Sequence, residues 1–357
     1  MKHPREILLG SQAAAGALPV CDHYSGVEVR MRKSLQLQAE MMQEFGACVF
    51  DVTLDCEDGA PVGGEHEHAL MVAELARQTM HSEAAVAGSI APRVAVRVHP
   101  VDHPAFVADI ATIVGRAGSA LCHLMIPKVE SLADVQRAVN EVDQASSAGA
   151  RALPLHVLIE SPAAVHRAFE IASHPRVQSM SFGLMDFVSA HGGAIPASAM
   201  SMGTAKNPQP LDQFTHPLVL RAKLEISSAC HAWGKVPAHG VVTEFSDAAV
   251  VQGAARRAAR ELGFTRMWSI HPNQIRPILA AFSPELREVE LAAKIIAAAA
   301  RADWAPISVE AQLHDRASYR YYWQLLERAH RTGLCLPAEV QGYFAPRSME
   351  TTTQESV

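Results

Sequence analysis

The sequence has no long hydrophobic run and no block of basic residues. No apolar stretch reaches the roughly 20 residues that a membrane-spanning helix needs, so we expect no membrane association. The 37 Asp and Glu residues outnumber the 31 Lys and Arg residues, which gives a formal net charge of −6. This balance argues against nucleic acid as a partner. No GxxxxGK or GxGxxG motif follows a predicted strand, which argues against a phosphate-binding enzyme.

The six cysteines include no CxxC pair, and most of them lie in apolar stretches. This pattern is typical of buried free thiols in a reducing compartment, so we expect a cytoplasmic protein. The apolar stretch near the N-terminus is interrupted at residues 10–12 by Gly, Ser and Gln. We therefore interpret it as an ordinary segment and not as a signal peptide.

The middle of the chain alternates short apolar runs with amphipathic stretches. Nearly continuous apolar runs are typical of parallel strands covered on both faces, and strands that alternate with helices indicate βαβ units. Seven such strands are predicted, and a possible eighth at residues 6–10 would close a (β/α)₈ TIM barrel. The seven cover residues 48–54, 93–98, 122–126, 155–159, 179–182, 236–239 and 267–270.

Helical patterns separate these runs, at residues 65–80, 131–145 and 246–262. The second begins with Ser131 as a predicted N-cap and carries Asp134 in its first turn. The third begins at a capping serine and ends before Gly263.

The pattern changes after residue 284. We predict a barrel domain over residues 1–284, interrupted by a long loop at 190–214 that is rich in Gly, Pro, Ser and Asn. A C-terminal helical extension follows over residues 285–345, with helices at 285–301 and 316–332. The polar tail at residues 346–357 is predicted to be disordered.

Ionisable residues follow nearly every predicted strand. In a (β/α)₈ barrel the reacting groups lie where strands end and loops begin. Strand ends are also exposed and tolerate charge, but only 19% of the chain is Asp, Glu, Lys or Arg, so the whole set favours a site. Its members are Glu57, Asp58, Arg97, His99, Lys128, Glu160, Asp186, His239 and His271.

Glu160 and Asp186 follow successive strands, so both carboxylates should face one barrel mouth. Two carboxylates suit a hard divalent cation such as Mg²⁺, with Mn²⁺ as a second candidate. Histidines and cysteines do not cluster with them in the sequence, which argues against zinc. Arg97 can bind a substrate carboxylate through two parallel hydrogen bonds.

Six segments, in order, resemble one family. DCEDGA, RVAVRVHP, MIPKVES, LIESPAAV, SFGLMDF and ELGFTRMWSIHPNQI are similar to segments of the citrate lyase β-subunit, malyl-CoA lyase and related HpcH/HpaI aldolases. The resemblance covers residues 47 to about 284. It implies a TIM barrel, Mg²⁺ held by Glu160 and Asp186, and Arg97 on the substrate. Homo-oligomers, often trimers or hexamers, are also implied.

The resemblance also implies a C-terminal aspartate that reaches the active site of a neighbouring subunit. Asp315 is the positional match, although the usual glycine is missing and an ordinary helix N-cap is the alternative. The family's first-strand motif, RSxLFVP, helps to seat coenzyme A and is absent. The substrate is therefore expected to be a small carboxylic acid or an acyl-CoA.

The leading hypothesis is a lyase that cleaves or forms a 3-hydroxy acid or its CoA thioester, of malyl-, citramalyl- or citryl-CoA type, through a metal-stabilised enolate. Glu57 or Asp58 would position Arg97 or metal-bound water, and Asp315 would transfer a proton. Lys128 and His239 are further candidates for substrate binding. One alternative is a CoA-independent 2-keto-acid (pyruvate) aldolase with His99 or His239 as base. The other is a non-catalytic barrel subunit.

Overall fold

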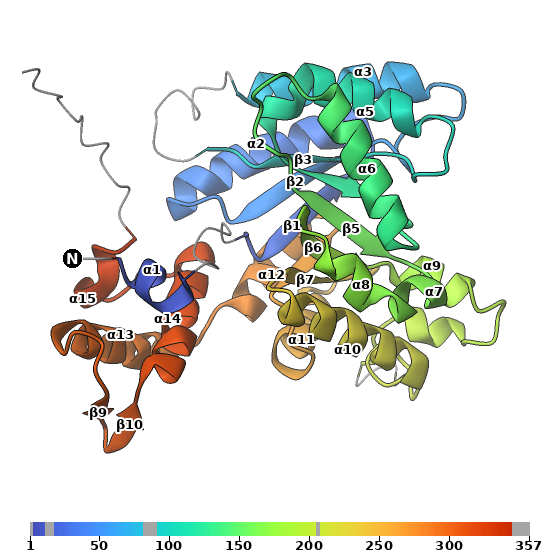
Figure 1. The fold of residues 1–357 in the computed structure, drawn as a ribbon. Helices are drawn as coiled ribbons and strands as arrows, with labels where there is room; N and C mark the ends of the chain where they lie inside the picture. Colours follow the sequence, from blue (N-terminus) through green and yellow to red (C-terminus); the bar gives the residue numbers. More distant parts are fainter. Residues whose placement is uncertain (1–2, 11–17, 81–90, 205–207, 345–357) are drawn as a thin grey trace, which may run out of the picture. The chain divides into compact units, whose positions relative to one another are not determined.

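The computed structural model describes residues 3–10, 18–80, 91–204 and 208–344. The chain divides into two compact units (Figure 1). Leu18–Ser283 forms one, and the described parts of Met1–Ala17 and Pro284–Val357 form the other. The tail that was predicted to be disordered lies outside the described residues. No helix in the described part of the chain is both long and apolar enough to cross a membrane.

The larger unit is a closed barrel of eight parallel strands in the order β1 to β8, which confirms the predicted (β/α)₈ fold. The barrel closes where β1 pairs with β8, with Cys21 opposite Met267. The strands are β1 (Cys21–Ser25), β2 (Phe50–Asp55), β3 (Val94–Arg97), β4 (Leu121–Ile126), β5 (Leu155–Ile159), β6 (Val177–Phe182), β7 (Val236–His239) and β8 (Arg266–Ser269).

The eighth strand was predicted in the wrong place. Residues 6–9 belong to a helix, α1 (Pro4–Leu9), with Pro4 in its first turn, His3 as its side-chain cap and Gly10 as its C-cap. The true first strand, β1, escaped detection because it alternates Asp22 and Tyr24 with other polar residues. Such a strand has no continuous apolar run, since its inward side chains form polar contacts within the barrel.

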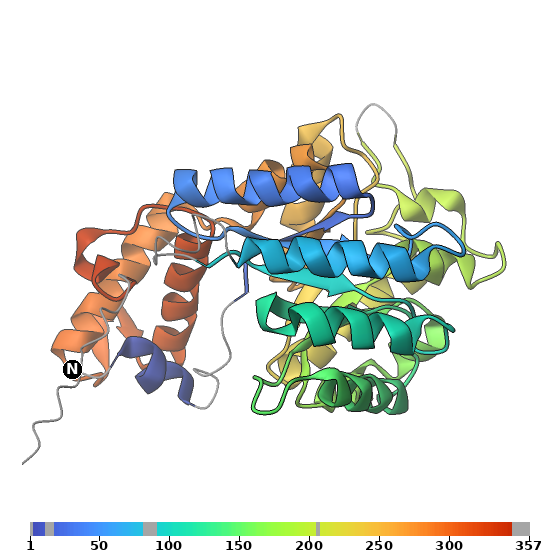
Figure 2. The same ribbon diagram turned by 90° about the horizontal axis from the view of Figure 1, so that it is seen from above.

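Helices connect the strands and cover the barrel. Figure 2 shows α2, α3, α5 and α6 side by side along one flank. The predicted cap of α6 is confirmed, because the Ser131 side chain accepts a hydrogen bond from the Asp134 N–H. The cap of α11 is Asp247 and not the predicted serine. The helices are α2 (Glu28–Phe45), α3 (Glu65–Thr79), α5 (Phe106–Ala117), α6 (Leu132–Ala145), α7 (Pro162–His166), α8 (Ala168–Ser173), α9 (Leu184–Ser189), α10 (Pro217–Ala232), α11 (Ala248–Glu261) and α12 (Pro272–Phe282).

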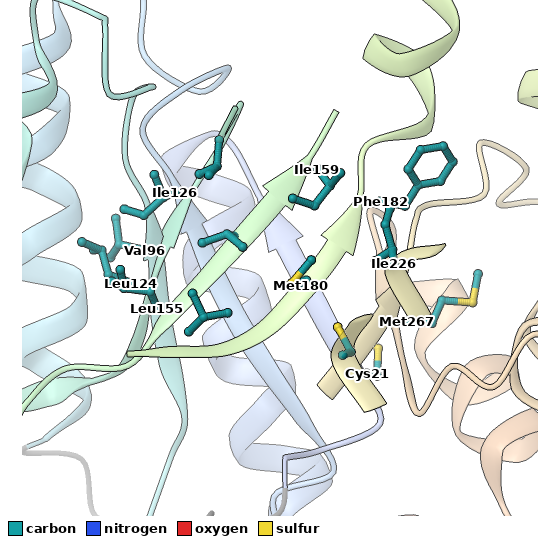
Figure 3. Close-up of a cluster of buried hydrophobic side chains, with 14 of the residues drawn as sticks. Cys21, Val96, Leu124, Ile126, Leu155, Ile159, Met180, Phe182, Ile226 and Met267 are labelled. Atoms are coloured by element: carbon teal, nitrogen blue, oxygen red, sulfur yellow. The ribbon is translucent and has the colours of Figure 1, made fainter. Parts of the chain in front are cut away.

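The two faces of each strand bury different side chains. Outward residues such as Val96, Ile126 and Ile159 pack in a continuous hydrophobic layer under the helices (Figure 3). Inward residues are polar or form a small separate cluster of Met125, Leu158 and Trp268. Side chains alternate between the two faces along a strand. The last inward-facing residue of each strand therefore lies at the barrel mouth, where it can be charged.

Residues 190–214 connect α9 to the segment before α10. The described part holds one 3₁₀ turn, η3 (Ala197–Met200), which packs on α9. The Asp212 carboxylate accepts hydrogen bonds from the N–H groups of Gly203 and Phe214.

The smaller unit contains α13 (Leu286–Arg301), α14 (Arg316–Arg331) and α15 (Ala338–Gln341), and α1 packs on α14. Its two long helices match the predicted ones closely. The stretch between them is not wholly helical, because β9 (Ile307–Val309) and β10 (Gln312–His314) form an antiparallel hairpin. Glu310 and Ala311 at its turn have φ of 51° and 62°. Such turns usually carry Asn or Gly, so this hairpin could not be predicted from Glu310 and Ala311.

Candidate active site

Arg97 and Asp55 form the centre of the charged cluster at the barrel mouth. They stand opposite each other at the ends of β3 and β2. The Arg97 guanidinium donates to both Asp55 carboxylate oxygens, at 2.6 Å from Nε and 2.9 Å from Nη2. The Arg97 side chain is 6% exposed and that of Asp55 is fully buried. These two hydrogen bonds to Asp55 therefore fix the plane of the Arg97 guanidinium.

Three further groups complete the surroundings of Arg97. Glu57 lies 2.6 Å from Nη1, and Asp58 accepts from Nη2 at 2.7 Å. The Tyr24 hydroxyl also accepts from Nη2, at 2.8 Å. Burial opposes the charge of Arg97, but Asp55 and Glu57 outweigh it and raise its pKa. The predicted association of Glu57 and Asp58 with Arg97 is thus present in the geometry.

Glu57 links this cluster to Lys128 and Glu160. The Lys128 ammonium donates to Glu57 Oε1 at 2.5 Å, and the Lys128 backbone N–H donates to Glu160 Oε2 at 2.7 Å. Lys128 has a φ of 50°, in the left-handed region that non-glycine residues seldom adopt. The turn after β4 is therefore shaped to direct a backbone donor at the Glu160 carboxylate.

Glu160 follows β5 and is 7% exposed. Burial raises the pKa of its carboxyl to about 7, with contributions from the negative charges of Asp186 and Glu57. Asp186 lies in the first turn of α9 and is exposed. Gly183 makes room for the carboxylate, because a Cβ at Gly183 would lie 2.4 Å from Glu160 Oε1.

The cluster carries more negative than positive charge. Its acids are Asp55, Glu57, Asp58, Glu160 and Asp186, and its cations are Arg97 and Lys128, so the acids exceed the cations by three. Arg97 and Lys128 are already engaged by acids, which leaves the Glu160 and Asp186 pair without a full counter-charge. A hard divalent cation with oxygen ligands fits this environment.

A cavity of about 560 Å³ opens beside this cluster, at the ends of β1 and β8. Tyr24 lines it on the Arg97 side. Phe245 and His271 stack with ring centroids 4.9 Å apart on another side. Arg30 and Lys33, both exposed on the first turns of α2, lie on its rim. The cavity is therefore largely apolar and has a basic edge.

Two predicted histidines have other surroundings. His239 is fully buried; its ring stacks on Phe214 with centroids 5.4 Å apart and meets Phe264 edge-on. Burial lowers its pKa well below the ordinary value. This position in the sheet–helix layer argues against the predicted contact with substrate. His99 is held by Asp109, with 2.6 Å between Nδ1 and a carboxylate oxygen.

Asp315 caps α14 in the smaller unit. Its carboxylate accepts from the N–H groups of Ala317 and Ser318, and the Ser318 hydroxyl oxygen accepts in turn from the Asp315 N–H. This is a capping box. The helix-cap alternative therefore accounts for the aspartate within one chain, and its predicted role in a neighbouring active site stays a prediction.

A second group of ligand-type side chains lies deeper in the barrel. Asp22, His123 and His156 have ligand atoms within 4.8 Å of one another, and all three are buried. However, Arg266 lies 2.7 Å from Asp22, and both nitrogens of His156 already bond to serines. A cation here would meet a buried guanidinium, so we interpret the group as a structural polar core.

Asp55 and Tyr24 are the site residues that sequence reasoning did not single out. Asp55 begins the DCEDG segment, so its position at a strand end could be predicted from the sequence. Its burial beneath Arg97 could not be predicted. Tyr24 lies on the strand that was not predicted, and the pairing of β1 with β2 brings it to Arg97.

A barrel with an acidic cluster at the carboxyl ends of its strands is typical of a metal-dependent (β/α)₈ enzyme. Residues 35–272 match the family model of the HpcH/HpaI aldolase/citrate lyase family, and the chain belongs to this family. The resemblance found in the sequence is thereby confirmed.

Curated relatives point in the same direction. The chain is 34% identical over 210 residues to the L-malyl-CoA/β-methylmalyl-CoA lyase of Cereibacter sphaeroides, covering 57% of this chain and 64% of that protein. The match thus spans less than two thirds of that relative's length. The citrate lyase subunit beta of Haemophilus influenzae is 27% identical over 258 residues, covering 71% of this chain and 78% of the relative.

Among solved structures, a citrate lyase from Burkholderia xenovorans superposes with a TM-score of 0.74 at 45% identity, covering 96% of this chain and 99% of that one. The protein CitE from Mycobacterium tuberculosis, solved with magnesium, acetoacetate and coenzyme A, gives a TM-score of 0.59 at 21% identity, covering 88% of this chain and 98% of that one. The second likeness shows the fold alone.

Proposed function

We propose that this protein is a Mg²⁺-dependent carbon–carbon lyase that cleaves or forms a 3-hydroxy acid or its CoA thioester. The observation that carries the proposal is the pair of carboxyl groups of Glu160 and Asp186, where the negative charge of Asp186 helps burial to raise the Glu160 pKa, beside an arginine fixed in a buried network. Relatives named malyl-CoA lyase and citrate lyase subunit beta support the reaction class.

Glu160 and Asp186 would hold the cation, with Mn²⁺ as a possible substitute. When bound, it would supply Lewis-acid stabilisation of negative charge on a carbonyl oxygen. The Lys128 N–H keeps one Glu160 oxygen in place, and Gly183 leaves the space that the carboxylate occupies.

Arg97 would bind the carboxylate of the acid. Its plane is set by Asp55, whereas Asp58, with a side chain that is 71% exposed, can yield its hydrogen bond to an incoming carboxylate. Lys128, at 45% exposure, adds a second cation at the mouth. In cleavage, a base accepts the hydroxyl proton and that oxygen becomes a carbonyl, the carbon–carbon electron pair moves to the α-carbon of the acyl part, and that carbon gains a proton. Asp315 of a neighbouring subunit is the candidate to accept the hydroxyl proton or to deliver a proton to the α-carbon.

The cavity beside Tyr24 favours a thioester over a free acid. Its apolar lining and the cations Arg30 and Lys33 on its rim suit a carrier arm that ends in phosphates. A CoA-independent pyruvate aldolase is the second candidate. The burial of His239 weakens its claim to be the base of such a reaction, while His99 stays a candidate.

A homo-oligomer, trimer or hexamer, is part of the proposal, because Asp315 needs a second subunit to serve as a proton-transfer group. We also propose that the protein is located in the reducing environment of the cytoplasm, and the six free cysteines support this location.

The direct test is an activity screen. Purified protein is incubated with malyl-CoA, citramalyl-CoA, citryl-CoA, the corresponding free acids and free 4-hydroxy-2-keto acids, with Mg²⁺ or with EDTA. Mg²⁺-dependent release of a keto acid and an acyl-CoA from one thioester is the expected result. Cleavage of free 4-hydroxy-2-keto acids alone would favour the pyruvate aldolase, and no turnover with any substrate would favour the non-catalytic alternative.

A further inference from the structure

Tyr24 joins the two charged residues at the centre of the site. It lies near the end of β1, and its hydroxyl donates to Asp55 Oδ2 at 2.5 Å while it accepts from Arg97 Nη2 at 2.8 Å. Burial raises the pKa of this phenol, so its proton stays available to Asp55 at neutral pH. The hydroxyl therefore bridges an acid and a cation that already contact each other.

The ring of Tyr24 has contacts of its own. The Arg97 guanidinium carbon lies 4.7 Å from the ring centroid, and Trp268 stacks on the ring at 6.0 Å with an interplanar angle of 19°. The same residue lines the cavity that Arg30 and Lys33 border. One side chain thus contacts both the carboxylate-binding arginine and the adjoining cavity.

The hydrogen bonds at Arg97 Nη2 show which of its acceptors an incoming carboxylate can replace. Asp55, Asp58 and Tyr24 all accept from this nitrogen, which carries two N–H groups. Asp58 is the most exposed of the three, so an incoming carboxylate can displace it. Tyr24 and the buried Asp55 then remain as the groups that hold Arg97 in orientation.

We propose that Tyr24 is a positioning residue, which holds the Arg97 guanidinium in the plane that binds the substrate carboxylate. The inference rests on the proposed function, in which Arg97 binds that carboxylate. Tyr24 acts through Arg97 and takes no part in bond making. Loss of its hydroxyl should therefore weaken binding of the acid without altering the chemical step.

The test compares Tyr24→Phe with the unchanged protein. Pyruvate is titrated in the presence of Mg²⁺ by calorimetry, and kinetics are measured with the substrate found by the activity screen. A hydrogen bond to a charged group contributes about a factor of ten or more in affinity. We expect the pyruvate Kd and the KM of the substrate to rise about tenfold, with kcat and binding stoichiometry unchanged.

Tyr343→Phe is the matched control, because it removes a tyrosine hydroxyl in the smaller unit and should change none of these values. Phenylalanine keeps the ring at position 24, so the melting temperature should be retained. An unchanged Kd, or a lower stoichiometry at unchanged Kd, would overturn the positioning role and leave the proposed function standing. If the unchanged protein neither binds pyruvate nor turns over any acid, the proposed function itself is contradicted.

Discussion

The backbone of Lys128 holds the side chain of Glu160: the Lys128 N–H donates to Glu160 Oε2 at 2.7 Å, and Lys128 adopts a φ of 50° to do so. A left-handed conformation in a lysine is costly and persists only where surrounding contacts enforce it. The Lys128 ammonium is itself bound to Glu57. The position of the proposed metal ligand is therefore set by the loop after β4, which the loop after β2 holds through Glu57.

Gly183→Ala should weaken metal binding while leaving the barrel folded. The added Cβ would lie 2.4 Å from Glu160 Oε1, so the carboxylate must move from its present position. We expect Mg²⁺ affinity, measured by calorimetry, to fall by at least about tenfold. Gly115→Ala, in α5, is the control; its Cβ would meet nothing closer than 3.9 Å, and the helix should gain about 0.5–1 kcal/mol. Equal Mg²⁺ affinity in the two variants would refute this role of Gly183.

Arg97→Lys should lower kcat/KM on the order of a hundredfold. Lysine keeps the charge but cannot reproduce the fork that Asp55 holds, nor present two parallel donors to a carboxylate. Steady-state kinetics and a melting curve separate activity from folding. Arg32→Lys, at an exposed ion pair with Glu28 on α2, is the control. If Arg97→Lys retained full catalytic efficiency, Arg97 would not belong to the substrate site.

The buried histidine His123 should make the barrel sensitive to acid. Burial lowers its pKa from 6.5 to about 4, against the opposing effect of Asp22 and Asp51. The unfolded chain takes up this proton below pH 6.5 and the folded chain only near pH 4. Stability present above pH 6.5 is therefore lost as the pH falls towards 4, by up to about 3 kcal/mol.

His123→Gln removes this titration, so the free energy of unfolding, measured by urea denaturation between pH 7 and 4, should fall less steeply than in the unchanged protein. The exposed His66→Gln is the matched control. An identical pH dependence in His123→Gln and the unchanged protein would show that His123 does not contribute.

Much of the fold was predictable because seven strands are nearly continuous apolar runs. The eighth was not, because β1 places Asp22 and Tyr24 inside the barrel and lacks such a run. Strand-end positions also predicted Glu57, Asp58, Arg97, Lys128, Glu160 and Asp186 for one mouth, and hydrogen bonds and ion pairs join the first five of these residues. His239 was misjudged because strand-end position does not tell which face a side chain takes, and here it lies among Phe214 and Phe264.

The role of Asp315 across a subunit interface can be tested by mixing. Asp315→Asn keeps the helix cap, because asparagine caps nearly as well as aspartate. Co-assembled with Glu160→Gln, it should restore partial activity, since some mouths then combine an intact metal site with an intact Asp315 from the other chain. Each variant alone should be inactive. Mixed oligomers, confirmed by mass, that regain no activity would remove the trans-acting role.

We propose that Glu160 and Asp186 bind one divalent cation, and crystals grown with Mn²⁺ and measured for anomalous scattering test this binding. We expect a single strong peak within about 2.2 Å of a carboxylate oxygen from each residue, and its loss in Glu160→Gln. Carboxylates more than about 6 Å apart, or a peak that touches neither residue, would exclude a shared cation, because two bonds of about 2.1 Å cannot span that distance.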